Sequence, residues 1–417
     1  MSDKPKRGAW TPLGQRNYRL FFAGQLISLI GTWTQNVAQA WLIYRLTGSS
    51  LHLGMVGFAG QVPVFLLALL GGSLADRSDR RRVLLGTQVT AMLLAFILAA
   101  LTMSGLVREW HVIGLAFLLG MVNAVDMPTR QSFLPEMVDR DQLHKAIGLN
   151  SSMFNGARMA GPALAGWLVA TVGEGWCFII NGLSFLAVIV GLSLMRLPPR
   201  SAPAPGPRAS TLRQASEGLR YAWDQRTIRR PLLMLGLSSL LGAPYLVLMP
   251  VFANRVLGGG PGTLGLLMGA SGLGALAAAL FLASRRQSGG LDRWPYHAAA
   301  GFGLCLGLFS QSTSLAFSLG LLVPTGFCMM LQAATTNTLL QQVVPDHLRG
   351  RVMAVYVMMF MGTMPFGSMA AGALASKIGV QFTLLAGAVV CLLAALALIA
   401  NLVKKPGLDG RPDGQSR

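Results

Sequence analysis

The 417-residue sequence has little charge and very few acidic residues. Charged residues make up 12% of the chain, about half the share of a typical soluble domain, and only 15 residues are Asp or Glu. A soluble protein of this length would need more charge to cover its surface. Hydrophobic residues make up 53%, which excludes a disordered chain. The composition therefore indicates an integral membrane protein.

Cysteine is scarce, and motifs for metals or nucleotides are missing. The four cysteines all lie in apolar runs and show neither disulfide nor metal-ligand spacing: Cys177, Cys305, Cys328 and Cys391. The glycine-rich run 258–262 lacks the Lys-Ser/Thr pair of a phosphate-binding loop. We therefore interpret the cysteines as free core residues, and we predict no enzyme, no cofactor and no metal site.

Basic residues are more numerous, with 34 Lys and Arg and a net charge of +19. They stand in short clusters between long apolar runs, which is typical of cytoplasmic loops and not of a nucleic-acid-binding surface. We expect no nucleic-acid partner. Residues 1–10 are basic and polar without a short apolar run and cleavage site after them, so we expect no cleaved signal peptide.

Apolar runs of about 20 residues, the length that spans a bilayer, recur about twelve times. They begin near Tyr18, Leu53, Val83, His111, Lys145 and Trp176, and then near Pro231, Thr263, Pro295, Leu315, Val352 and Gln381. The predicted fold class is an all-α integral membrane protein with two six-helix bundles. The predicted domains are an N-terminal bundle (1–196), a cytoplasmic linker (197–230), a C-terminal bundle (231–403) and a cytoplasmic tail (404–417).

The linker begins with a Pro-rich run that cannot be helical. Its second part, 210–225, is predicted to form a short amphipathic helix at the membrane surface. A cytoplasmic N-terminus would place almost all basic residues in the cytoplasm. The exceptions are Arg158 within a helix and four residues outside: Arg45, Arg108, Arg255 and Lys377. An even number of spans also returns the C-terminus to the cytoplasm.

The two halves share a glycine pattern. Three glycines of the fifth predicted helix recur in the eleventh, 206 residues later each time: Gly156, Gly161 and Gly166 against Gly362, Gly367 and Gly372. The second and eighth helices are both rich in glycine near their starts: Gly54, Gly57 and Gly60 against Gly265, Gly269 and Gly272. Glycine is common in membrane helices, so chance is the alternative. Three matches at one offset favour a pseudo-two-fold repeat, a known transporter plan.

The most specific motif, residues 72–82, follows the second predicted span and reads Gly-Ser-Leu-Ala-Asp-Arg-Ser-Asp-Arg-Arg-Arg. It resembles the signature loop of the major facilitator superfamily, Gly-x-Leu-Ala-Asp-Arg-x-Gly-Arg-Arg, with Asp79 in place of the second glycine. The resemblance implies a loop that controls conformational switching through Gly72, Asp76, Arg77, Arg80 and Arg81. The alternative is a plain positively charged cytoplasmic loop.

Physical chemistry supports a switching role for this loop. Gly72 would let two helices approach closely, and Asp76 would cap the positive N-terminus of a neighbouring helix. The arginines would pair with carboxylates at the cytoplasmic face. Neutralising Asp76 is therefore expected to reduce transport without abolishing folding.

The resemblance covers nearly the whole chain. Gly24-Gln25-Leu26-Ile27-Ser28 and Asp126-x-Pro128-x-Arg130 look like the branch that contains enterobactin exporters and macrolide efflux proteins. Gly161, Pro162 and Gly166 are similar to the antiporter motif of drug exporters, with Ala165 in place of one glycine. That branch implies export from the cytoplasm across a bacterial inner membrane, commonly coupled to protons.

Polar residues follow one stripe of the first predicted helix at steps of three and four: Gln25, Ser28, Thr32, Gln35, Asn36 and Gln39. Such a stripe faces protein or water, because exposure to lipid would be costly. It would either line a substrate cavity or form hydrogen bonds between helices. Asn155, Gln332 and Thr336 are further candidates for the cavity wall.

Asp126 and Arg158 are the ionisable residues most clearly at membrane depth, where such groups are functional candidates. Asp126 is expected to pair with Arg80, Arg81, Arg130 or Arg158, either as a structural ion pair that gates conformation or as a proton carrier. Arg158 would either form a structural pair or bind an anionic group of the substrate.

We therefore predict an exporter of a small organic molecule, siderophore-like or an amphipathic drug, that works by alternating access. We expect a proton gradient to drive transport. We also expect the protein to contact membrane lipid and to work as a monomer. Three alternatives stay open: a facilitator or importer on the same fold, a lipid transporter, and a non-transporting membrane sensor or scaffold.

Overall fold

The computed structural model describes residues 11–196, 211–284 and 293–404, without the side chains of 68–77, 211–216, 218 and 402–404. The predicted tail beyond residue 404 and the Pro-rich run 198–207 lie outside the described residues. Over the described ranges the chain is helical and contains no strand. The predicted all-α class is therefore confirmed.

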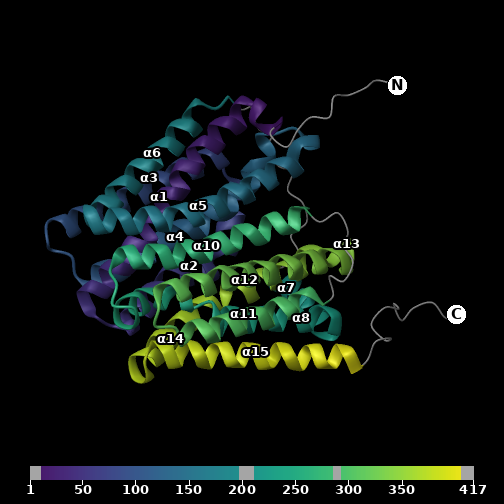
Figure 1. Cartoon of the computed structure of the whole chain (residues 1–417). Coiled ribbons are helices and arrows are strands. Elements are labelled where there is room, and N and C mark those ends of the chain that lie inside the picture. Colours follow the sequence, from purple (N-terminus) through teal and green to yellow (C-terminus); the bar gives the residue numbers. More distant parts are fainter. Residues whose placement is uncertain (1–10, 197–210, 285–292, 405–417) are drawn as a thin grey trace.

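Six long helices form the first half of the molecule (Figure 1): α1 (Arg16–Thr47), α2 (Ser50–Arg77), α3 (Arg80–Met103), α4 (Glu109–Phe133), α5 (Leu143–Thr171) and α6 (Glu174–Leu194). Short 3-10 turns are η1 (Thr11–Gly14), η2 (Leu134–Glu136) and η3 (Arg140–Gln142). The predicted spans from Tyr18 to Trp176 correspond to these six helices in order.

The second half repeats this plan with two helices that contain π-helical turns. Residues Arg226–Val256 run continuously through α8 (Arg226–Leu237), η4 (Ser238–Gly242), α9 (Tyr245–Val251) and η5 (Phe252–Val256). Then follow α10 (Pro261–Ser284), α11 (Trp294–Ser310) and α12 (Leu315–Val343). Asp346–Ile378 contains α13 (Asp346–Val357), η6 (Met358–Gly362) and α14 (Met364–Ile378), and α15 (Val380–Lys404) is last.

Nine helical segments of the described chain are long and apolar enough to cross a bilayer. The other three long helices, α1, α5 and α11, complete the predicted order of six spans, a break and six spans. Polar residues interrupt α1 and α5, as Gln35 and Arg158 illustrate, and α11 is described over only 17 residues. The predicted membrane fold is thus confirmed.

The break contains a helix, α7 (Thr211–Asp224), at the place where an amphipathic helix was predicted. It packs against α8 and α13 of the second half. Arg351 Nη1 lies 2.5 Å from Glu217 Oε2 and so ties α13 to α7. Gln225 adopts an extended conformation between α7 and α8. Helix α8 therefore begins inside the segment predicted as linker, ahead of Pro231.

Local sequence explains where two of the helices begin and end. Gly48 closes α1 in the left-handed region (φ 60°), and its N–H donates to the Tyr44 carbonyl at 2.7 Å. Asp79 is the N-cap of α3, where its carboxylate accepts from the backbone N–H groups of Arg81 and Arg82 at 3.0 and 3.3 Å. The residue that departs from the family's signature thus starts the third helix.

Glycines let the two halves cross closely at two equivalent places. A Cβ at Gly265 of α10 would lie 2.7 Å from the Pro162 carbonyl of α5, and a Cβ at Gly54 of α2 would lie 2.6 Å from the Ser368 carbonyl of α14. Pro162 and Ser368 stand 206 residues apart, the offset of the glycine repeat. The predicted pseudo-two-fold repeat is confirmed by these reciprocal crossings.

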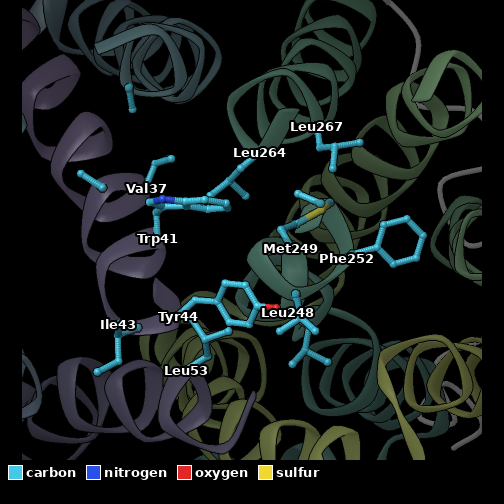
Figure 2. Close-up of a cluster of buried hydrophobic side chains, with 14 of the residues drawn as sticks. Val37, Trp41, Ile43, Tyr44, Leu53, Leu248, Met249, Phe252, Leu264 and Leu267 are labelled. Carbon is cyan, nitrogen blue, oxygen red and sulfur yellow. The ribbon is translucent and has the colours of Figure 1, made fainter. Parts of the chain in front are cut away.

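The start of α1 and the end of α15 lie at one end of the molecule, here named the terminal end (Figure 1). At the opposite end, the far end, a single hydrophobic core joins both halves. Figure 2 shows part of it, with Trp41 beside Leu264 and Tyr44 beside Leu248, the first residue of each pair from the first half and the second from the second half.

Toward the terminal end, each half has a core of its own. The first half contributes a cluster around Tyr18, Phe133 and Val188, and the second half a separate cluster around Ile228 and Leu340. Among the described side chains, the halves therefore share their packing at the far end and have separate clusters near the terminal end.

Candidate functional site

A network of polar side chains surrounds Asp126 inside the first half. The carboxylate is 1% exposed, and Arg130, one helical turn later, forms an ion pair with its Oδ2. Its Oδ1 accepts hydrogen bonds from Thr87 Oγ1 and Gln88 Nε2 of α3, both at 2.8 Å. Arg130 Nη1 donates to Gln25 Oε1 of α1 at 2.9 Å. The network thus links α1, α3 and α4 through one buried charge.

Of the partners predicted for Asp126, the structure pairs it with Arg130. Arg80 instead donates to the Ser132 carbonyl at 2.9 Å and pairs with Glu136 Oε1 at 2.6 Å. Arg81 donates to the Ser193 carbonyl at 2.7 Å. The two loop arginines therefore tie the start of α3 to the ends of α4 and α6.

Three residues of the predicted switch loop, Gly72, Asp76 and Arg77, belong to α2 by their backbone. Their side chains lie outside the described ones, so their predicted roles remain predictions. In the described part of the loop, an aspartate caps α3 and Arg80 pairs with Glu136, but the aspartate is not the one that was predicted to cap a helix. The capping aspartate is Asp79.

Arg158 lies midway along α5 and is partly buried. Its guanidinium carbon stands 5.9 Å from the centroid of the Trp33 ring of α1. Its backbone carbonyl meets α10 of the second half, where a Cβ at Gly272 would lie 2.8 Å from it. Arg158 therefore lies where the first half meets the second.

The polar stripe of α1 divides between two neighbours. Gln25 accepts from Arg130 of α4, and Gln35 Oε1 accepts from Asn181 Nδ2 of α6 at 2.8 Å. Ser28 and Gln39 are buried, Thr32 is partly buried and Asn36 is exposed. Gln25 and Gln35 thus form hydrogen bonds between helices.

The remaining cavity candidates are buried in both halves. Asn155 donates from Nδ2 to the Ser151 carbonyl at 2.9 Å in its own helix. Gln332 and Thr336 of α12 are 1% and 0% exposed, and Gln332 Nε2 and Thr336 Oγ1 have no hydrogen-bond partner among the described residues. Both side chains are closed off in this structure, so their predicted contact with a substrate remains a prediction.

The antiporter-like residues form the crossings that join the helices. Gly161 packs on the backbone of α1 at Ile30 and Trp33, and Gly166 lies against Gly265 of α10. A Cβ at Gly166 would lie 2.8 Å from the Gly265 Cα. The predicted motif therefore occupies the contact of α5 with both α1 and the opposite half.

Sequence reasoning missed Thr87, Gln88 and Trp33. Gln88 stands alone in the apolar run of α3, and a lone polar residue at membrane depth is a signal that it needs a partner. Trp33 gave no such signal, because an aromatic residue is ordinary in a membrane helix. Among the described residues, no group of three His, Cys, Asp or Glu side chains could hold a metal ion.

Comparison with known proteins assigns this architecture. The profile of the transmembrane secretion effector family, a family of the major facilitator superfamily, matches residues 7–411. The chain belongs to this family. The predicted resemblance is confirmed, and the protein is a membrane transporter.

Three relatives of this transporter match it over nearly their full length. The staphyloferrin A transporter of Staphylococcus aureus is 27% identical over 395 residues, which cover 93% of this chain and 97% of the relative. The multidrug efflux pump Tap of Mycolicibacterium fortuitum is 28% identical, and the match covers 90% of this chain and 93% of the relative. Macrolide efflux protein A of Streptococcus pyogenes is 23% identical, and the match covers 93% of this chain and 98% of the relative.

Solved structures share the transporter's fold at low identity. A bacterial homologue of the human lysosomal transporter Spinster, in an inward-facing and occupied conformation, superposes with a TM-score of 0.71 at 14% identity and covers 96% of this chain and 99% of its own. A nucleoside transporter gives a TM-score of 0.69 at 13% identity, covering 92% and 99%.

Proposed function

We propose that this transporter exports a small organic molecule from the cytoplasm by alternating access, driven by proton entry. The observation that carries the proposal is the uneven contact between the halves: one shared core at the far end and separate cores toward the terminal end. An arrangement that is closed at one end and divided at the other is one of the two states that alternating access needs.

The basic residues orient this state. Arg45 and Arg255 lie at the far end of α1 and η5, whereas Arg80 and Arg81 lie at the terminal end with most of the basic loops. Cytoplasmic loops carry the excess of Lys and Arg, which supports a cytoplasmic terminal end and an inward-facing protein. A bacterial inner membrane with both termini in the cytoplasm fits this orientation.

The moving parts would be the two six-helix bundles, 1–196 and 231–403, joined by the linker 197–230. A single chain then supplies both sides of the binding site, which supports a monomer as the working unit. The names of the relatives, which include a staphyloferrin A transporter, a multidrug pump and a macrolide efflux protein, support a siderophore-like molecule or an amphipathic drug as the substrate.

Asp126 is the proposed point of proton coupling. It is buried at membrane depth, and its charge holds Arg130, which in turn bonds Gln25 of α1. A proton on Asp126 would cancel the attraction for Arg130 and so loosen the link between α4 and α1. Proton binding would thereby be coupled to helix movement within the first half.

Inside-out vesicles test the proposal directly. Vesicles that contain the protein are supplied with staphyloferrin A, erythromycin or ethidium, with and without an uncoupler. We expect accumulation of at least one compound, abolished by the uncoupler and by Asp126→Asn. Equilibration that ignores the uncoupler would overturn proton coupling and establish a facilitator, and no movement of any compound would contradict export of these classes.

A further inference from the structure

Arg158 carries a positive charge that no described side chain balances. Among the described residues, no hydrogen bond or ion pair reaches its guanidinium, although most other arginines near carboxylates are paired, as Arg130 is with Asp126 and Arg45 with Glu174. An ionisable group at membrane depth almost always has a partner, because an unpaired charge there is costly. Arg158 therefore differs from the paired arginines in having no anionic partner among the described residues.

The surroundings of Arg158 leave the N–H groups of its guanidinium available for hydrogen bonds. The Arg158 guanidinium lies over the Trp33 ring, with 5.9 Å from the ring centroid to the guanidinium carbon. Gly161 lies against Trp33, and the Trp33 ring meets Phe154 edge-on at 5.9 Å, so the indole is held in place. A guanidinium presents its N–H groups in its own plane. The contact with the Trp33 ring therefore uses none of the guanidinium donors.

Arg158 lies on α5 at the edge of the region where the two halves touch. The close approaches of α5 and α10 run from Gly166 and Gly265 to Gly272, whose Cβ would lie 2.8 Å from the Arg158 carbonyl. Beyond this crossing, toward the terminal end, the halves have separate cores.

We propose that Arg158 binds an anionic group of the substrate, a carboxylate, between the halves. The carboxylate would accept two parallel hydrogen bonds from the guanidinium edge and supply the charge that the protein lacks. This inference rests on the proposed function, because it places the substrate between the two bundles. It adds a specific contact for those substrates that carry a carboxylate, whereas substrates without one would bind between the halves without using Arg158.

Binding to the purified, full-length protein in lipid nanodiscs provides the first test, with citrate and carboxyfluorescein as the probes. We expect saturable binding to the wild type, weakened about tenfold or more in Arg158→Gln. Arg158→Lys should retain part of the affinity, because it keeps the charge and loses the two-pronged geometry. Arg19→Gln removes one charge from an exposed position at the terminal end and should bind like the wild type.

Transport provides the second test and separates this inference from the proposed function. In inside-out vesicles, Arg158→Gln should lose accumulation of carboxyfluorescein and keep accumulation of the cation ethidium, which also shows that the variant folds. Wild-type protein that accumulates ethidium and neither binds nor moves a carboxylate probe would overturn the inference and leave the proposed function standing. Arg158-dependent binding without any transport would support the inference and contradict the proposed function.

Discussion

At the scale of single residues, the pair of Asp126 and Arg130 is unequal in its surroundings. The side chain of Asp126 is 2% exposed and that of Arg130 is 29% exposed. Removing the arginine would leave a carboxylate in the interior with only Thr87 and Gln88 as neutral donors. Removing the carboxylate would leave a cation that still reaches solvent and Gln25.

This asymmetry predicts the order of stability in a double-mutant cycle. Arg130→Gln should lower the free energy of unfolding by about 3 kcal/mol, because it leaves a buried charge without its partner. Adding Asp126→Asn should recover part of that loss. Thermal unfolding of the four proteins in one detergent measures the order. A double variant with a lower Tm than Arg130→Gln would show that the buried charge is not the source of the loss.

The residues of this network differ in how far the sequence predicts them. Asp126 and Arg130 are four positions apart on a helix, so a pair between them follows from helical geometry alone. Thr87 and Gln88 come from another helix, and their contact depends on how α3 and α4 are aligned along their axes. A single sequence does not contain that alignment. The same holds for Trp33 beneath Arg158, since it needs the crossing of α1 and α5.

At the scale of helices, the glycine crossings set how closely the halves approach. Gly166 of α5 lies against Gly265 of α10, and any side chain on either residue would meet backbone. Gly148, on the same helix nearer the terminal end, has nothing within 4 Å of the place where its Cβ would be. These two glycines of α5 therefore make a matched pair, one at an interface and one away from it.

Valine should impair transport at one of the two positions and leave it unchanged at the other. Gly166→Val should reduce transport about tenfold or more, because the added carbons hold the halves apart at the far end. Gly148→Val should transport like the wild type. Initial rates of ethidium accumulation, corrected for the amount of protein in the membrane, measure both. Equal rates in the two variants would show that close approach of α5 and α10 is not needed.

At the scale of the whole molecule, the sequence predicts the arrangement of the helices better than the conformational state of the transporter. Apolar runs and the glycine repeat give the number, order and pairing of the membrane helices. They do not tell which end of the molecule is closed, because the same residues make contacts in one state and lose them in another. The π-helical turns at Ser238–Gly242 and Met358–Gly362 were also not predicted, since no proline lies within either turn.

Fixing the far end should stop the transport cycle. A Cβ at Gly57 of α2 would lie 3.3 Å from the Ser368 Cβ of α14, close to the separation in a disulfide, so cysteines there should join the halves. In a chain whose native cysteines are replaced by alanine, Gly57→Cys with Ser368→Cys should lose nearly all transport on oxidation. A reductant should restore it.

The control for this experiment joins two helices of the same half. A Cβ at Gly307 of α11 would lie 3.6 Å from the Ala388 Cβ of α15. Oxidising Gly307→Cys with Ala388→Cys should leave transport unchanged, because both helices would move together. Continued transport by an oxidised Gly57–Ser368 pair would mean that the far end need not open.

The two reciprocal crossings have a mechanical consequence. Gly265 on the Pro162 carbonyl and Gly54 on the Ser368 carbonyl fix the halves to each other at two separate points. Both crossings belong to the end of the molecule where the halves share a core, so opening the far end means parting both of them. Because either crossing alone would hold the halves together, the two would have to part in one step, which would make the opening of the far end an all-or-none event.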